Sequence, residues 1–345
     1  MSQPQNGAAP PTQRELAKML NVGLATVSMA LRDDPRISRA RRRQIQAAAR
    51  KAGYVPNPNA AALSHMRHPP TGDSVRAALA WVNLWPHADD LRQYAEFKGY
   101  WRGAVAAAQK FGYRLEEFHA GDADQIHRME SVLLARGING LLIAPYGGIQ
   151  PTWGDFDWNH FSVIRIGRSS LDPACHVVTA DQLSDAALAF HEMRARGYER
   201  IGMVSSGISY HLFEAGYIHA QQFVPARQRL SVFRFSTPSP WDDLKMLQRW
   251  LKAEKPDAVF TAVPIMGEIL KACGRRVPQD IGLAVTSILD AGADSGIDQH
   301  AEEIGRVAVL SLISLIHDND RGIPPIPREI LIKGRWVNGS SLPPR

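Results

Sequence analysis

The chain has 345 residues, 45% of them hydrophobic and 21% charged, which is typical of globular proteins and long enough for more than one domain. No apolar run approaches the roughly 18 residues that a membrane helix needs, so we expect no membrane association. The opening segment MSQPQNGAAPP lacks a basic region followed by an apolar core, and we therefore expect a cytoplasmic protein without a secretory signal.

The two cysteines, Cys175 and Cys273, lie far apart and supply neither a disulfide framework nor a zinc-ligand cluster. We expect both to be buried, reduced thiols. His65 and His68 share helical spacing, but no further ligand cluster accompanies them, so exposed histidines are favoured over a metal site. No cofactor is predicted.

The excess positive charge is confined to the N-terminal part of the chain. The first 68 residues hold 11 Lys and Arg against 3 Asp and Glu, or +8, whereas the remainder holds 29 against 31, or −2. Such a basic segment attracts nucleic-acid phosphates independently of sequence. A solvated basic face is the alternative, and the helical pattern of the same segment favours DNA.

Two short helices are predicted at the start of this basic segment. Thr12 and Glu15 have the spacing of a capping box, which marks the beginning of a helix. The run Asn21-Val22-Gly23 then interrupts the apolar pattern, and a second helix follows over 24–31. On this second helix the inward-facing residues are predicted to be Val27 and Leu31.

A third helix begins after Ser38, a good N-cap, and ends at Gly53, which suits the left-handed position after a helix. Three helices within about 45 residues make a small DNA-reading module. Beyond them, Pro56 and Pro58 restrict the chain and can start a short helix through Leu63. An ordinary linker helix is the alternative there.

A polar segment rich in Pro and Gly, HMRHPPTGDS, marks a domain boundary, after which β and α patterns alternate. Repeated β-α units predict doubly wound parallel sheets in an α/β core. Strands are predicted at 75–84, 114–118, 140–144, 162–166, 177–179, 201–205, 231–235, 258–262 and 282–286. Helices are predicted at 98–112, 126–136, 183–196 and 213–222.

Residues 12–64 resemble the DNA-binding region of the lactose repressor family, in the runs TQRELAKMLNVGLATVSMALRDDPRIS and AARKAGYVPNPNAAAL. Landmarks of its sensor core follow, among them ARGINGLLIAP, RARGYERIGMV and VPQDIGLAV. The resemblance implies a disordered N-terminus at 1–11, a helix-turn-helix headpiece at 12–56, a hinge helix and linker at 57–74, and a two-lobed, periplasmic-binding-protein-like core for effector binding and dimerisation at 75–345. It implies a homodimeric transcription regulator, a repressor, that binds a pseudo-palindromic operator in double-stranded DNA.

The same resemblance implies which headpiece residues touch DNA. The second helix enters the major groove and faces the DNA with Leu24, Ala25, Thr26, Ser28 and Met29. Phosphates are held by Thr12, Arg36, Ser38 and Arg41, and the exit and hinge contribute Tyr54, Asn57, Ala60 and Leu63. Leu63 is the wedge at a central base step of the minor groove. Because Leu24, Ala25 and Met29 cannot make bidentate hydrogen bonds to bases, readout is expected to depend on apolar contact; core packing is the alternative for Met29.

In the core, the resemblance implies a small-molecule effector between the lobes, beyond the carboxyl ends of the strands. Candidate effector residues are Trp81, Trp85, Tyr94, Tyr146, Arg168, Asp181, Phe213, Trp241 and Ser287. Sugar-binding relatives place an Arg where Phe213 stands, Asn-Asp where Val263-Pro264 stands, and an Asp where Ser287 stands. The hypothesis is an effector that is carbohydrate-like or more apolar, or absent; core packing is the alternative for each aromatic residue.

The alternative functions are those of an enzyme and of a secreted solute-binding protein. An enzyme is disfavoured because the chain has no G-x-G-x-x-G after a strand, no G-x-x-x-x-G-K-[ST] and no G-x-S-x-G. A secreted solute-binding protein is disfavoured by the basic headpiece and by the opening segment. Ligand-driven closure of the two lobes is expected to change operator affinity.

Overall fold

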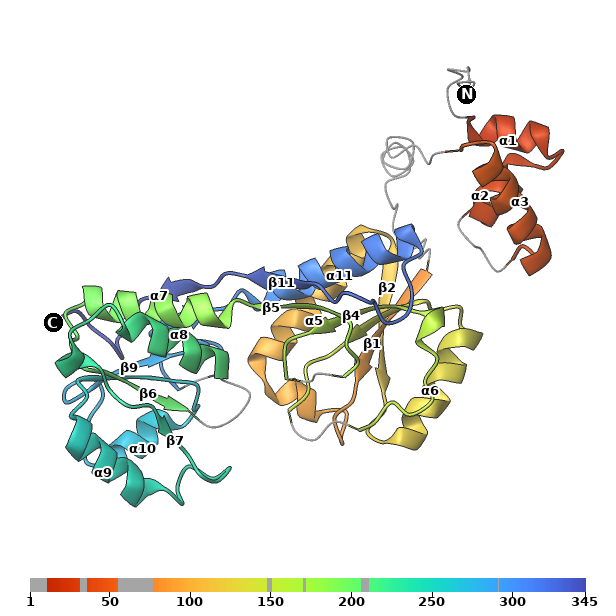
Figure 1. Cartoon of the computed structure of the whole chain (residues 1–345). Helices are drawn as coiled ribbons and strands as arrows, with labels where there is room; N and C mark the ends of the chain where they lie inside the picture. The colour runs from red at the N-terminus through yellow and green to blue at the C-terminus, as the bar shows by residue number, and fades with distance from the viewer. Residues whose placement is uncertain are drawn as a thin grey trace. The chain divides into compact units, whose positions relative to one another are not determined.

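The computed structural model describes residues 11–31, 36–54, 77–147, 151–169, 172–205, 211–290 and 292–345. The chain divides into two compact units, Met1–Ser74 and Val75–Arg345, coloured from red to blue along the chain in Figure 1. Among the described helices, none has both the length and the apolarity to cross a membrane.

The N-terminal unit contains three helices, α1 (Gln13–Met19), α2 (Leu24–Leu31) and α3 (Arg39–Lys51). Both predicted N-caps are present, since the side chains of Thr12 and Ser38 each accept a hydrogen bond from a backbone amide one turn on. Gly53 adopts the left-handed conformation predicted for it, with φ of +68°. The buried core of this unit is small and consists of Leu16, Ala17, Val27, Ala30, Ile45 and Ala49.

The predicted inward face of α2 was half right. Val27 is fully buried as expected, but its buried companion is Ala30, three residues on, whereas Leu31 is half-buried at the edge of the cluster. Positions 27 and 30 lie on the same side of a helix, and the small Ala30 lets α2 approach α3 closely. The predicted hinge helix, with Asn57, Ala60 and Leu63, lies outside the described residues, as do His65 and His68.

The first lobe of the C-terminal unit is built on a six-stranded sheet in the order β11-β5-β4-β3-β1-β2, with every pair parallel. Its strands are β1 (Ala77–Asn83), β2 (Tyr113–His119), β3 (Gly140–Ile143), β4 (Ser162–Ile166), β5 (His176–Ala180) and β11 (Glu329–Ile332). Its helices are α5 (Ala95–Lys110), α6 (Ala123–Ala135), α11 (Ala301–Asp318) and the short 3-10 turns η1 (Asp90–Gln93) and η2 (Trp158–His160).

The second lobe repeats this plan with the strand order β12-β10-β9-β8-β6-β7, in which only the β10–β12 pair is antiparallel. Its strands are β6 (Ile201–Ser205), β7 (Phe233–Arg234), β8 (Ala258–Thr261), β9 (Gly282–Val285), β10 (Gly296–Asp298) and β12 (Arg335–Val337). Its helices are α7 (Gln182–Ala195), α8 (His211–Gln221), the 3-10 turn η4 (Ala226–Gln228), α9 (Leu244–Glu254) and α10 (Met266–Ala272).

The chain passes between the lobes three times, from β5 to α7, from β10 to α11 and from β11 to β12. Helix α11 therefore returns to the first lobe, where it lies beside α5 (Figure 1). Two glycines make this contact possible: a Cβ at Gly103 would lie 1.8 Å from the carbonyl oxygen of Glu302, and a Cβ at Gly305 would lie 1.9 Å from that of Tyr100. The backbones of the two helices touch at this crossing.

The predicted α/β architecture is confirmed, with differences at the ends of elements. Helix α5 begins at Ala95, three residues before the predicted start, and β7 has only two residues of the five predicted. Cys175 is buried as expected, but Cys273 is half-buried, and both are free thiols. The C-terminal elements from α9 onward include several that periodicity had not marked, above all α11 and the strands β11 and β12.

Candidate DNA-binding face and effector site

Helix α2 presents its first turn to solvent. The side chain of Leu24 is 43% exposed and Ala25 is exposed as well. The next predicted contacts, Thr26, Ser28 and Met29, are half-buried, and none of them belongs to the buried core cluster of the headpiece. A surface of two apolar residues followed by two hydroxyls suits contact with thymine methyl groups better than bidentate base recognition.

Thr12 closes the N-terminus of α1 through a complete capping box. The hydroxyl of Thr12 accepts a hydrogen bond from the amide of Glu15 at 3.3 Å, and the Glu15 carboxylate accepts one from the amide of Thr12 at 2.6 Å. These hydrogen bonds lower the pKa of Glu15. Thr12 is exposed, at a helix end whose amides favour anions.

A second exposed helix start lies at α3. The Ser38 hydroxyl accepts a hydrogen bond from the amide of Arg41 at 3.4 Å, and the Arg41 guanidinium donates to Gln44 at 2.7 Å. Arg36 and Arg41 are both exposed. Guanidinium groups beside a helix N-terminus form a suitable arrangement for a phosphate.

Tyr54 lies where the chain leaves the headpiece. Its hydroxyl accepts a hydrogen bond from the side-chain amide of Gln13 at 3.0 Å, and its ring packs against the headpiece core. This hydrogen bond attaches the end of the headpiece, at Tyr54, to helix α1. The contacts predicted further on, at Asn57, Ala60 and Leu63, fall on residues that the structure does not describe, so the wedge remains a prediction.

Three of the predicted effector residues lie together in the first lobe. The ring of Trp85 lies 5.7 Å from that of Tyr94 and 5.5 Å from that of Tyr146, and its indole N–H donates to the carbonyl of Pro145 at 2.9 Å. Phe97, which the sequence had not singled out, joins the group at 4.9 Å from Tyr94. Tyr94 is 40% exposed, whereas Trp85 and Tyr146 are buried, and burial raises the pKa of Tyr146.

Beside this aromatic group, the two lobes are joined by hydrogen bonds. The carboxylate of Asp290, after β9, accepts hydrogen bonds from the amides of Ala95 and Glu96 at 2.6 and 3.0 Å. The Glu96 carboxyl accepts a hydrogen bond from the Tyr100 hydroxyl at 3.0 Å, and the side chain of Ser287 lies nearby. Burial is the main reason that the pKa of Glu96 is raised to about 7, and the nearby Asp290 adds to the effect.

Ser287 was predicted from the sequence as an effector residue, whereas Glu96 and Asp290 were not. Glu96 could have been found, because a carboxylate in the first turn of an amphipathic helix, four residues before a tyrosine, is a recognisable polar interruption. Asp290 offered no such signal, since its partner lies 194 residues away in the chain.

A second buried carboxyl lies at the crossing between the lobes. Asp185 of α7 accepts a hydrogen bond from the amide of Gly334 at 2.8 Å through Oδ1, whereas its Oδ2 has no hydrogen-bond partner among the described residues. Burial raises the pKa of Asp185 to about 7. The side chain thus holds the β11–β12 crossing against the first turns of α7.

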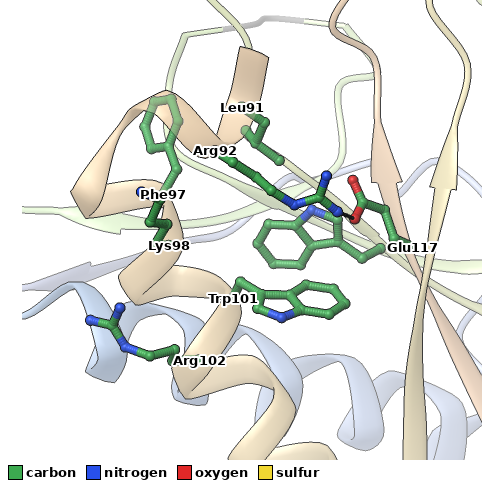
Figure 2. A pocket seen from close by; sticks show the side chains of 8 residues that line it. Leu91, Arg92, Phe97, Lys98, Trp101, Arg102 and Glu117 are labelled. Carbon is green, nitrogen blue, oxygen red and sulfur yellow. Dashed lines mark hydrogen bonds and ion pairs between the residues drawn. The ribbon is translucent and has the colours of Figure 1, made fainter. Parts of the chain in front are cut away.

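The remaining predicted effector residues are not gathered at this place. Trp81 is fully buried in the first lobe and lines a cavity on its flank (Figure 2). Phe213 is fully buried in the second lobe, with its ring 6.4 Å from that of Phe260, and Trp241 is 45% exposed in the turn before α9. Arg168 is paired with Glu329, and Asp181 caps α7 by accepting a hydrogen bond from the amide of Ser184.

Among the described residues, no group of three or more His, Cys, Asp or Glu side chains is arranged to hold a metal ion. The carboxyls at the lobe interface instead accept hydrogen bonds from backbone amides and hydroxyls. These carboxyls therefore act as hydrogen-bond acceptors that join neighbouring elements.

Two family models match the chain. Residues 12–57 match the model described as bacterial regulatory proteins, lacI family, and residues 190–342 match a periplasmic binding protein-like domain. The chain is 24% identical over 305 residues to the HTH-type transcriptional regulator CelR of Thermobifida fusca, a match that covers 85% of this chain and 84% of that relative. It is 25% identical over 330 residues to the HTH-type transcriptional repressor CytR of Escherichia coli strain K12, covering 88% and 89% of the two chains.

Solved structures show the same fold. A transcriptional regulator CelR–cellobiose complex superposes with a TM-score of 0.58 at 20% identity, covering 96% of this chain and 99% of that one. The lac repressor dimer bound to operator and the anti-inducer ONPF superposes with a TM-score of 0.52 at 17% identity, covering 97% and 99%. Both matches cover the headpiece and the core, so the order of helices and strands is shared along nearly the whole chain.

Proposed function

Because this chain belongs to the lacI family of bacterial regulatory proteins, we propose that it is a transcriptional repressor that binds a pseudo-palindromic operator as a homodimer. Its operator affinity changes when a small molecule binds between the lobes of the core. The headpiece reads the DNA, and the three chain crossings between the lobes carry the effect of the ligand.

The headpiece is the observation on which this function rests. A net charge of +8 lies in the first 68 residues, and the exposed first turn of α2 lies in the same unit as the exposed arginines at the start of α3. The basic groups supply phosphate attraction, and the exposed apolar residues of α2 supply contacts that differ between bases. Few functions other than DNA recognition need both features in so small a unit.

A dimer follows from the size of this unit. One headpiece can contact only a few base pairs, and two headpieces related by a two-fold axis read two half-sites of opposite direction. The lac repressor in the similar solved structure is a dimer on its operator. We propose the same symmetry here, with dimerisation through the core.

For the effector, we propose a small molecule held against the aromatic group of Trp85, Tyr94 and Tyr146 at the interface of the lobes. The similar CelR structure holds cellobiose, and aromatic faces bind the apolar faces of sugar rings as well as flatter apolar ligands. The buried ring of Phe213 offers no guanidinium at its position. The effector is therefore carbohydrate-like or more apolar.

The relatives are transcriptional regulators, and we propose no catalytic activity for this chain. A regulator of operators acts where the chromosome is, so we propose that the protein is cytoplasmic.

Selection of bound genomic DNA fragments by the purified full-length protein tests the proposal. The expected outcome is one enriched motif with two-fold symmetry, in which two half-sites flank a central pyrimidine–purine step. Enrichment of fragments without a shared motif would contradict sequence-specific repression, and a motif without two-fold symmetry would contradict the dimer.

A further inference from the structure

Three carboxyl groups lie where the two lobes meet. Glu96 is in the first turn of α5, two residues after Tyr94, and it is half-buried. Asp290 of the second lobe accepts hydrogen bonds from the amides of Ala95 and Glu96, at 2.6 and 3.0 Å. Asp185 of α7 supplies the third carboxyl, whose charge also acts on Glu96. Glu96, Asp185 and Asp290 are called the junction acids below.

The junction acids have no basic partner. None of the three has an ion-pair partner among the residues that the structure describes. Elsewhere in the core, Glu214 is only 7% exposed and is paired with Arg234. The basic groups of the lobe crossings are also paired, since His300 lies 3.6 Å and Arg335 2.9 Å from the carboxylate of Asp298. The junction acids therefore carry negative charge that no neighbouring cation offsets.

Asp185 shows the same deficit at a single atom. It is 1% exposed, and its Oδ1 accepts a hydrogen bond from the amide of Gly334 at 2.8 Å, whereas its Oδ2 has no partner among the described residues. Burial, together with other acids, raises the pKa values of Asp185 and Glu96 to about 7. A buried carboxyl oxygen without a donor costs free energy, and a bound cation relieves such a cost.

The aromatic group beside the junction acids supplies the second element of a cation site. Tyr94 is 40% exposed, and its ring lies 4.9 Å from that of Phe97 and 5.7 Å from that of Trp85. Aromatic faces attract ammonium groups, and the attraction is larger where the ammonium is shielded from water. A neutral ligand would use these ring faces but would leave the junction acids without a cation.

We propose that the effector of this protein carries a protonated amine, held between the ring of Tyr94 and the carboxyl of Glu96. This inference rests on the proposed effector site at the lobe interface and names the chemical class of its ligand, an ammonium group on a sugar ring or on an aromatic ring. An ionised Glu96 pairs with ammonium, whereas a protonated one does not. Binding therefore releases a proton near neutral pH.

Calorimetric titration of the full-length protein at pH 6.5, where the amines are protonated, tests the proposal with two matched pairs of probes. Tyramine is compared with tyrosol, and glucosamine with glucose, so that an aromatic amine is distinguished from an amino sugar. We expect at least one amine to bind at one site per chain, with a dissociation constant of roughly 10 μM to 1 mM. Its uncharged counterpart is expected to bind at least about tenfold more weakly.

A matched pair of variants locates the charge. Glu96→Gln keeps an acceptor for the Tyr100 hydroxyl and is expected to weaken the amine about tenfold and to abolish the proton release. Titrations in phosphate and in Tris, whose heats of ionisation differ, measure that release. Glu199→Gln removes an exposed carboxyl directly before β6 and is expected to leave the affinity within about twofold.

Four outcomes would overturn the proposal. They are the absence of saturable amine binding up to about 10 mM, equal affinity for an amine and its counterpart, equal losses in the two variants, and unchanged proton release in Glu96→Gln. Operator binding by the same protein separates this test from that of the proposed function. Specific operator binding without amine binding would refute the amine and leave the repressor, whereas amine binding without operator specificity would support the amine and refute the repressor.

Discussion

The carboxylate of Asp290 in the second lobe accepts a hydrogen bond from the amide of Glu96 in the first lobe, at 3.0 Å. A second bond from the amide of Ala95, at 2.6 Å, makes Asp290 the cap of α5. The first amides of a helix have no partner within the helix, so a carboxylate there is stabilising. A residue of the second lobe thus caps a helix of the first lobe. Rotation of one lobe against the other would have to break these two hydrogen bonds unless Asp290 moves together with α5.

Replacement of Asp290 tests the energetic weight of the cap. Asp290→Ala is expected to lower the free energy of unfolding of the core by about 1–2 kcal/mol, the usual loss for an N-cap. Asp290→Asn keeps an acceptor oxygen and is expected to lose less. Urea denaturation of the full-length variants measures both, and equal stability of Asp290→Ala and wild type would show that the cap contributes nothing.

The pH dependence of stability follows from Glu96 and Asp185, whose pKa values are both raised to about 7, chiefly by burial. Between the ordinary carboxyl range and pH 7, the folded chain holds protons that the unfolded chain releases. Stability is therefore expected to fall as the pH rises through this window, by about 1–3 kcal/mol for each group.

Glu96→Gln is expected to flatten this fall, because an amide stays uncharged and still accepts the hydrogen bond from Tyr100. Glu268→Gln, at an exposed position of α10, serves as the control that leaves the fall unchanged. Urea denaturation at pH 5.5 and pH 8 makes the comparison. A Glu96→Gln variant with the full pH dependence of wild type would refute the role of this carboxyl.

The close contact between α5 and α11 predicts that Gly→Ala substitutions differ strongly in their effect on stability. Gly103→Ala would place a Cβ 1.8 Å from a backbone oxygen, so the helices have to separate, and a destabilisation of about 3 kcal/mol is expected. Gly267→Ala in α10 meets nothing closer than 3.9 Å and is expected to be neutral or stabilising. The melting temperatures of the two variants are compared by thermal unfolding. Similar melting temperatures would mean that the backbones of α5 and α11 are not in close contact.

The exposed first turn of α2 predicts where DNA affinity is lost without loss of fold. Leu24→Glu places a negative charge on the proposed DNA face and is expected to weaken operator binding by roughly 100-fold, since each headpiece of a dimer loses a contact and gains a repulsion. Met19→Glu makes the same change at a residue that is 66% exposed on α1. Fluorescence anisotropy with the operator duplex measures the affinity of both variants, and Met19→Glu is expected to bind more tightly than Leu24→Glu. An equal loss of affinity in the two variants would argue against α2 as the helix that contacts the bases.

Local signals predicted the headpiece well. The caps at Thr12 and Ser38 and the glycine at 53 each act within one helical turn, and the observed helices begin and end beside them. Strands β1 to β9 were likewise predicted from short apolar runs. These elements could be predicted because the residues that determine them lie close together in the sequence.

The elements and contacts that the sequence did not predict depend on distant partners. Strand β11 is mostly exposed, and it pairs with β5 about 150 residues earlier. The Asp290–Glu96 contact and the meeting of Trp81 with Trp101 require the folded lobes, because no periodicity relates the residues involved. Among the proposed effector residues, the sequence could name aromatic types but not separate those that line a surface from those in the core.

Sequence-specific repression is tested by the ratio of affinities for the selected palindromic duplex and for a scrambled duplex, measured with the full-length protein at two salt concentrations. A repressor that reads bases is expected to keep a ratio of about 10³ or more as salt rises, although both affinities fall. A ratio near one, with both affinities collapsing together in salt, would mean that the headpiece holds only phosphates and would contradict sequence-specific repression.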